Sequence, residues 1–145
     1  MGSFVIMSTT QPTATARYEG QLHTEATHRA SGTVIQTDAP VDNHGRGAAF
    51  SPTDLVGTAL ATCILTTMAI VAERHQIQFA GATASMQKTM SPDAPRRIAR
   101  LAVELRLPAS LTDTERRLLE RTAHTCPVGL SLHPDLQQEL HFVYE

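Results

Sequence analysis

The sequence has no tryptophan, only two cysteines and no cluster of basic residues. Its lysines and arginines are scattered and its net charge is −2, whereas nucleic-acid-binding domains concentrate positive charge on one face. Two distant cysteines in 145 residues do not form the disulfide framework of a small secreted protein. We therefore expect a cytoplasmic protein of one domain, long enough for a substantial core, without a nucleic-acid partner.

Signatures of bound cofactors are also missing from the sequence. The seven histidines are scattered and lack the spacing of a zinc site, although His124 lies close to Cys126. No glycine-rich phosphate-binding loop is present. We expect neither a metal nor an organic cofactor. A hydrolase built on a cysteine–histidine pair stays open, because the sequence does not place the oxyanion site that it needs.

The longest uncharged segment, residues 55–72, bears on whether the chain enters a membrane. It just reaches the length of a membrane span. However, it holds four threonines and a glycine, and Asp54 and Glu73 flank it closely. A buried core helix can have the same composition. We therefore expect a core helix and no membrane partner.

Apolar periodicity predicts five strands and two helices after a flexible arm of residues 1–16, in which Phe4–Met7 is too short for a signal peptide. Ser51 to Asp54 is typical of a helix start, with a serine N-cap, a proline at the first helical position and an acid soon after. The order predicts an α+β fold with antiparallel strands around a long central apolar helix. We expect strands at 17–27, 32–37, 79–90, 97–107 and 139–144, a turn at 30–32, and helices from Ser51 to about Arg74 and from Thr112.

The central helix is apolar on nearly all sides, and such a helix must be buried around most of its circumference. At about 1.5 Å per residue it is roughly 34 Å long. A single small domain offers too little cover for this surface. We therefore expect a second subunit to bury the remainder.

Cys63 lies about three turns inside this apolar helix. A nucleophilic cysteine must be a thiolate, which apolar surroundings oppose, and the helix dipole fades beyond the first turn. Reactivity at Cys63 therefore requires a cation from elsewhere in the fold, and Arg29, Arg46 and Lys88 are the candidates. Without one, Cys63 is a packed core residue.

Cys126 precedes Pro127 where the second helix is interrupted. We expect a thiol at such a break to be better placed to move and react than one within a helix. Spacing alone leaves both cysteines open to a passive packing role.

Two motifs resemble the OsmC/Ohr family of thiol-dependent peroxidases and their less characterised relatives. These are "FSPTDLVGTALATC", which leads into the long apolar helix, and the later "CPVGLSLHPDL". The resemblance extends from about Arg17 to the end of the chain. It implies a single OsmC-like domain over residues 17–145 and an intertwined homodimer with the two long helices packed centrally.

The resemblance also implies roles for individual residues. Cys63 corresponds to the family's peroxidatic cysteine and Cys126 to its resolving cysteine. Arg29, one place off in the alignment, is nearest to the family's arginine, and Asp54 to its acid beside the helix start. In the hydroperoxide branch the acid directly follows the proline, where this chain has Thr53, so the chain resembles the broader OsmC-like branch. Asp54 as a simple helix cap and Arg29 as a solvated residue are the alternatives.

The function that this resemblance implies is reduction of organic hydroperoxides in defence against oxidative stress. Cys63 would form a sulfenic acid, Cys126 would convert it to a disulfide, and a small thiol or lipoyl-type dithiol would restore both thiols. The alternative is a non-catalytic module that binds a hydrophobic small molecule in the dimer groove.

Overall fold

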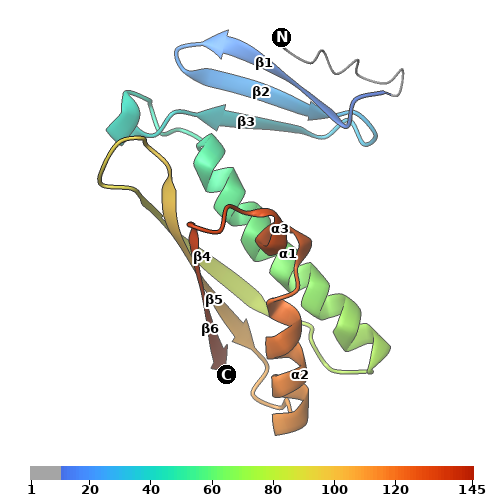
Figure 1. Cartoon of the computed structure of the whole chain (residues 1–145). Helices are drawn as coiled ribbons and strands as arrows, with labels where there is room; N and C mark the ends of the chain where they lie inside the picture. Colours follow the sequence, from blue (N-terminus) through green and yellow to red (C-terminus); the bar gives the residue numbers. More distant parts are fainter. Residues whose placement is uncertain (1–10) are drawn as a thin grey trace, which may run out of the picture. The chain divides into compact units, whose positions relative to one another are not determined.

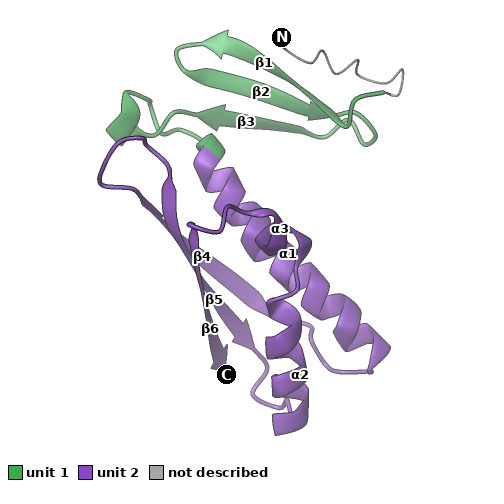
Figure 2. Cartoon of the chain, in the orientation of Figure 1, with its two compact units in different colours: residues 1–52 green, residues 53–145 purple. Residues whose placement is uncertain are grey.

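The computed structural model describes residues 11–145, and the chain divides into two compact units, residues 1–52 and 53–145 (Figure 2). Each unit contains one three-stranded sheet. The helices longer than one turn follow the first unit. The expected single domain over residues 17–145 stays a prediction, and most of the expected arm lies outside the described residues.

The first unit is an antiparallel sheet in the order β1-β2-β3 (Figure 1). Its strands are β1 (Ala14–Gly20), β2 (His23–His28) and β3 (Val34–Asp38). The single strand expected at 17–27 is wrong, because a tight turn separates β1 from β2. Gln21 and Leu22 have φ values of 54° and 60° there, and neither is a residue that usually signals such a turn. β1 also begins within the expected arm.

The turn expected at 30–32 is confirmed between β2 and β3. Gly32 has a φ of 74°, a conformation that glycine adopts without steric cost. The His28 amide donates to the Thr33 carbonyl over 2.8 Å and closes the turn. The polar segment that follows β3 contains one short 3₁₀ helix, η1 (Val41–Asn43).

The second unit combines three helices with a sheet of order β4-β5-β6. β5 pairs with β4 antiparallel but with β6 parallel, so the expectation of antiparallel strands throughout is wrong for the last strand. Two helices between β5 and β6 return the chain to the starting end of the sheet, as a parallel pair requires. The elements are α1 (Pro52–Arg74), β4 (Thr83–Met90), β5 (Ile98–Leu107), α2 (Asp113–Ala123), α3 (Pro127–Ser131) and β6 (Gln137–Tyr144).

Both predicted helix starts are confirmed. α1 begins at Pro52 and ends at Arg74, as expected. At the start of α2, the Glu115 amide donates to the Thr112 hydroxyl over 3.2 Å, and the Thr112 amide donates to the Glu115 carboxylate over 2.9 Å. This reciprocal capping box supplies partners to two amides that a helix start would otherwise leave unpaired.

The core lies between α1, α2 and one face of the second sheet. On β5 the predicted apolar face is confirmed, since all four of its leucine and valine side chains are buried. α1 lies close to the sheet at Gly57, where a Cβ atom would lie 2.6 Å from the Met86 sulfur and 3.1 Å from Leu101 Cδ2. The buried residues of α1 are Gly57, Leu60, Ala61, Ile64, Met68 and Ala72.

The opposite side of α1 is much less covered within the chain. Thr62 and Thr66 are exposed, and Ile70 is 46% exposed. α1 has the length and composition of a membrane span, yet only 33% of its most apolar part is buried. One such helix is weak evidence for membrane insertion, because the core helix of a soluble protein has the same composition. The sheet-facing side of α1 is packed as a core helix.

Candidate functional site

Cys63 lies on the flank of α1, beside its sheet-facing side. The side chain is half-buried and packs against the core. Its sulfur lies 4.0 Å from the Thr67 hydroxyl, one turn further along the helix. Cys63 is therefore more accessible than its apolar surroundings in the sequence indicate, since the periodicity of α1 turns it away from the sheet.

Cys126 lies between α2 and α3 and is the N-cap residue of α3. Its sulfur accepts a hydrogen bond from the Gly129 amide over 3.2 Å. The residue is only 2% exposed. The predicted break in the helix is confirmed, but Cys126 is the less accessible of the two thiols, contrary to the expectation that it would react more easily.

The two thiols are direct neighbours in the folded chain. The Cys63 side chain interacts with the Cys126 sulfur, and both cysteines are reduced in the structure. A Cβ atom added at Gly129 would lie 3.2 Å from the Cys126 sulfur and 3.4 Å from Leu60 Cδ1, which places Cys126 against the turn of α1 that precedes Cys63. The fold thus brings together the two residues that the resemblance pairs.

The environment of Cys126 favours its protonated form. Burial raises the pKa of the Cys126 thiol above its ordinary value, and the Gly129 amide opposes this rise by donating to the sulfur. The neighbouring Cys63 thiol raises the pKa of Cys126 further. At neutral pH the pair therefore consists of a half-buried Cys63 beside a buried and protonated Cys126.

Asp54 lies in the first turn of α1 and forms an ion pair with Lys88 of β4. The Lys88 ammonium donates to Asp54 Oδ1 over 2.7 Å and to the Thr53 hydroxyl over 2.9 Å, and the lysine side chain is only 14% exposed. Nine residues separate Asp54 from Cys63, which places them about 13 Å apart along α1 and on opposite sides of it. The structure therefore does not bring Asp54 or Lys88 to the thiols within this unit, and Asp54 is more than a cap.

The other two candidate cations belong to the first unit. Arg29 is exposed in the turn after β2, and its amide donates to the Thr13 carbonyl over 3.0 Å. The Arg46 guanidinium lies 3.7 Å from Asp38 Oδ1. Within residues 53–145, the Cys63 sulfur has no lysine or arginine as a hydrogen-bond partner.

Asp38, which the sequence analysis did not single out, is the most buried carboxylate of the first unit, at 1% exposure. The His23 ring nitrogen Nδ1 lies 2.6 Å from Asp38 Oδ1, and the Ala48 amide donates to Oδ2 over 2.9 Å. The hydrogen bond with His23 is the largest influence that holds the pKa of Asp38 below its ordinary value. This cluster ties the segment after β3 back to β2, and it has no signature in the sequence beyond a carboxylate at a strand end.

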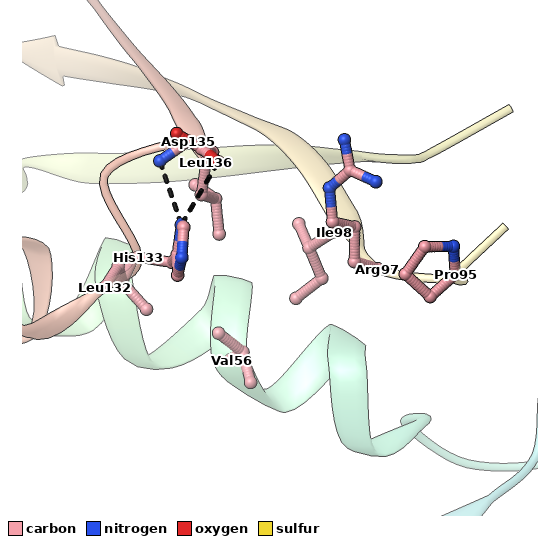
Figure 3. A pocket seen from close by; sticks show the side chains of 8 residues that line it. All are labelled: Val56, Pro95, Arg97, Ile98, Leu132, His133, Asp135 and Leu136. Atoms are coloured by element: carbon pink, nitrogen blue, oxygen red, sulfur yellow. Dashed lines mark hydrogen bonds and ion pairs between the residues drawn. The ribbon is translucent and has the colours of Figure 1, made fainter. Parts of the chain in front are cut away.

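Two hollows border the face of α1 that carries Cys63. The first, of about 510 Å³, is mainly apolar, and its size suits a small organic molecule (Figure 3). Figure 3 shows Val56 of α1 and Leu132 facing it, while His133 and Asp135 interact with each other at its edge. The lining residues are Val56, Pro95, Arg97, Ile98, Leu132, His133, Asp135 and Leu136.

The second hollow, of about 380 Å³, lies between α1 and α2. Along α1, Val56 of the first hollow precedes Cys63 by two turns and Thr67 of the second follows it by one, all on one face of the helix. Cys63 thus lies between the two hollows. The second hollow is lined by Thr67, Ile70, Val71, Arg74, Leu118, Arg121, Thr122 and Thr125.

Within residues 11–145, histidine, cysteine and acidic side chains do not gather in any group of three or more that could hold a metal ion. His124 is exposed at the end of α2, next to the segment that contains Cys126. The chemistry that the arrangement offers is that of two neighbouring thiols.

An α+β fold in which a thiol on the long helix neighbours a second thiol at the start of α3 defines a class, and comparison with known proteins specifies it. Residues 44–141 match the OsmC-like protein family. A structure from Psychrobacter arcticus 273-4, whose provisional name refers to osmotic stress induction and a detoxification response, shares 43% identity at a TM-score of 0.87, with 92% of this chain and 96% of that chain covered. The chain therefore belongs to the OsmC-like family, which confirms the resemblance and the α+β fold class.

More distant structures share the fold. The organic hydroperoxide resistance protein OsmC of Legionella pneumophila is 18% identical at a TM-score of 0.73, with 92% of this chain and 98% of that chain covered. A Vibrio cholerae protein provisionally named for organic hydroperoxide resistance, with captopril bound in one of its active sites, has the same identity and TM-score, with coverage of 95% and 94%. No curated protein sequence matches the chain.

The different burial of the two thiols leads to a prediction about alkylation. In the native protein, iodoacetamide should modify Cys63 at least about tenfold faster than Cys126, because Cys126 is inaccessible and its raised pKa lowers its thiolate fraction. Peptide mass spectrometry over time measures both rates. In denaturant the rates should converge, and faster modification of Cys126 in the native state would contradict the structure.

Proposed function

We propose that this OsmC-like protein is a thiol-dependent peroxidase that reduces organic hydroperoxides in the cytoplasm, in defence against oxidative stress. The single observation that carries the proposal is the contact between the half-buried Cys63 thiol and the buried Cys126 thiol. Family members named for hydroperoxide resistance support the same chemistry.

The proposed reaction has two steps in the protein. The Cys63 thiolate attacks the O–O bond of the hydroperoxide, which yields the alcohol and a sulfenic acid on Cys63. The Cys126 sulfur then attacks the Cys63 sulfur, a disulfide forms, and the sulfenic hydroxyl leaves as water. Because Cys126 is protonated at neutral pH, its proton is available to that leaving hydroxyl.

The apolar hollow beside Val56 is the proposed site of the organic part of the peroxide. Its aliphatic lining favours an organic hydroperoxide over hydrogen peroxide, since burial of apolar surface contributes about 25 cal/mol per Å². The captopril in the Vibrio cholerae protein is a precedent for a small organic molecule in an active site of this fold. The same hollow would serve the alternative function, non-catalytic binding of a hydrophobic molecule.

Two of the three candidate cations for Cys63 already lie beside a carboxylate. Lys88 is engaged with Asp54, and Arg46 lies beside Asp38. Arg29 is exposed and has no hydrogen-bond or ion-pair partner for its side chain among the described residues. We infer that Arg29 stabilises the Cys63 thiolate in the assembled protein.

The assembled protein is proposed to be a homodimer. The side of α1 formed by Thr62 and Thr66 is uncovered within the chain, although the helix is apolar. β1 is exposed along nearly its whole length, and a three-stranded sheet with so little buried surface is not stable alone. A second copy of the chain is the proposed cover for both surfaces.

The division of labour between the thiols tests the peroxidase. In Cys126→Ser, one equivalent of cumene hydroperoxide should convert Cys63 to a sulfenic acid that dimedone traps, and excess peroxide should drive it to the sulfinic acid. In Cys63→Ser, Cys126 should react at least about tenfold more slowly. Intact-mass spectrometry follows both variants. Equal oxidation of Cys126 without Cys63 would reverse the roles, and an inert Cys63 would favour the binding function.

The cation is tested through the reactivity of Cys63. Arg29→Ala should slow iodoacetamide modification of Cys63 about tenfold at neutral pH, because removal of a nearby cation destabilises the thiolate. Arg46→Ala and Lys88→Ala are the comparison variants and should leave the rate within about twofold. If one of these two slows the reaction while Arg29→Ala does not, the assignment of the cation is wrong.

The dimer is tested by sedimentation equilibrium. The wild type should sediment at twice the chain mass of 15.7 kDa at micromolar concentration. The double variant Thr62→Arg and Thr66→Arg should shift the equilibrium toward monomer, because it places two charges on the uncovered side of α1 that the partner would bury. Gln87→Arg, on the exposed side of β4, is the matched control. A wild-type protein that sediments as a monomer would contradict the proposed homodimer.

A further inference from the structure

The second hollow, between α1 and α2, has a different chemical character from the apolar one. Ile70, Val71 and Leu118 form an apolar part, while Arg74 and Arg121 contribute two positive charges. None of its lining residues is acidic. Neither guanidinium forms a hydrogen bond or ion pair with a described residue, so both remain available to a ligand.

Neither cysteine lines this hollow, but one neighbour of each cysteine does. Thr67, on its α1 side, is the residue whose hydroxyl lies 4.0 Å from the Cys63 sulfur. Thr125, on its other side, directly precedes Cys126 in the chain. A hydroperoxide needs access to Cys63 alone, whereas a reductant must reach the bond that joins the two sulfurs. A hollow whose lining includes a neighbour of each thiol therefore suits a reductant better than a peroxide.

We propose that this hollow binds the reductant of the Cys63–Cys126 disulfide, and that the reductant is a small thiol bearing a carboxylate. The proposal rests on the proposed peroxidase function, which supplies the disulfide. Arg74 and Arg121 would hold the carboxylate, because guanidinium groups pair with carboxylates through two parallel hydrogen bonds. The thiol would then point past Thr67 toward the sulfurs.

The dimensions of the hollow limit the size of this molecule. Arg74 follows Thr67 by seven residues, about 10 Å along α1, and helical side chains lean back toward the N-terminus. A volume of about 380 Å³ lies at the small end of the range for ligand pockets. The ligand is therefore a low-molecular-weight thiol with its two functional groups a few bonds apart. Three of the lining residues, Arg74, Arg121 and Thr125, are exposed in the single chain.

The proposed reduction proceeds by two thiol–disulfide exchanges. A thiolate of the reductant attacks one sulfur of the Cys63–Cys126 disulfide, forms a mixed disulfide and releases the other cysteine as a thiolate. A second reductant molecule attacks the mixed disulfide, releases the remaining cysteine and leaves as the oxidised dimer of the reductant. Two thiols are oxidised to one disulfide, and their two electrons and two protons restore the cysteine pair.

The test separates the reductive half of the cycle from the oxidative half. The full-length protein is oxidised with one equivalent of cumene hydroperoxide, freed of peroxide, and mixed with either 3-mercaptopropanoate or its neutral analogue 3-mercapto-1-propanol. Acid quenching and intact-mass spectrometry give the rate of reduction, corrected for the thiolate fraction of each reagent. The wild type should react several-fold faster with the anionic thiol, and added salt should reduce this preference.

Arginine variants locate the binding site. Arg74→Gln and Arg121→Gln should each slow reduction by 3-mercaptopropanoate about threefold, as expected for a solvent-exposed ion pair, and leave 3-mercapto-1-propanol unaffected. Arg117→Gln, an exposed arginine of α2 that does not line the hollow, is the matched control and should change neither rate. Thermal melting of each variant confirms that it is folded.

Three outcomes would overturn the inference. Equal rates of reduction by 3-mercaptopropanoate and 3-mercapto-1-propanol in the wild type would exclude carboxylate recognition. An equal loss of rate in Arg117→Gln would show that the effect comes from the overall charge of the protein. If Arg74→Gln and Arg121→Gln instead slow oxidation of the protein by a carboxylate-bearing hydroperoxide and leave the rate of disulfide reduction unchanged, the hollow binds the peroxide. If cumene hydroperoxide forms no disulfide, the peroxidase proposal fails instead. Diamide can then oxidise the two cysteines to the disulfide, so that the reduction rates still test thiol binding in the hollow.

Discussion

The packing of α1 against the β4-β5-β6 sheet is the constraint on which both thiols depend. Gly57 allows the helix to approach the sheet closely, and Leu60 and Ile64 are almost fully buried on either side of Cys63. Burial of each such side chain contributes about 2 kcal/mol to folding. The position of Cys63 is therefore held by its neighbours and does not require burial of its own thiol. The same packing holds the turn that carries Cys126 against α1. Movement of α1 by one turn would therefore separate the sulfurs.

The burial that positions the thiols also gives them different chemical properties. Cys126 is buried and protonated, with the Gly129 amide directed at its sulfur. Cys63 lies on the flank of the helix, where a substrate can reach it. On the face of α1 that carries Cys63, an apolar hollow lies toward one end and a cationic hollow toward the other. This arrangement would allow a peroxide and a reductant to approach the pair from different sides.

Local signals in the sequence predicted most helices and strands, whereas strand pairing depends on contacts between segments that are distant in the sequence. The start of α1 at Pro52 and the capping box at Thr112 follow from side chains within a few residues of each other, and both were predicted. The turn at Gln21 and Leu22 was not, because both residues adopt a left-handed backbone that side chains of their types rarely signal. The parallel pairing of β6 depends on where α2 and α3 return the chain, which no local pattern specifies.

The candidate site shows the same limit. The family motifs identified Cys63 and Cys126, and the fold brings them together. Periodicity did not reveal that Cys126 is the more buried thiol, nor that Lys88 pairs with Asp54, because both depend on how α1 meets other elements. The position of Arg29 near the thiols depends on an assembly that one chain does not contain, and it stays a prediction.

The central claim is that the two thiols form one redox unit within a single chain. Non-reducing peptide mapping of the wild type, after one equivalent of cumene hydroperoxide, tests it most directly. The account predicts one cross-linked peptide pair that joins Cys63 to Cys126 with the loss of two hydrogen atoms, in protein that keeps the mass of one chain under non-reducing denaturing conditions. A persistent gain of oxygen on Cys63 with Cys126 still alkylatable, or a disulfide between chains, would contradict it.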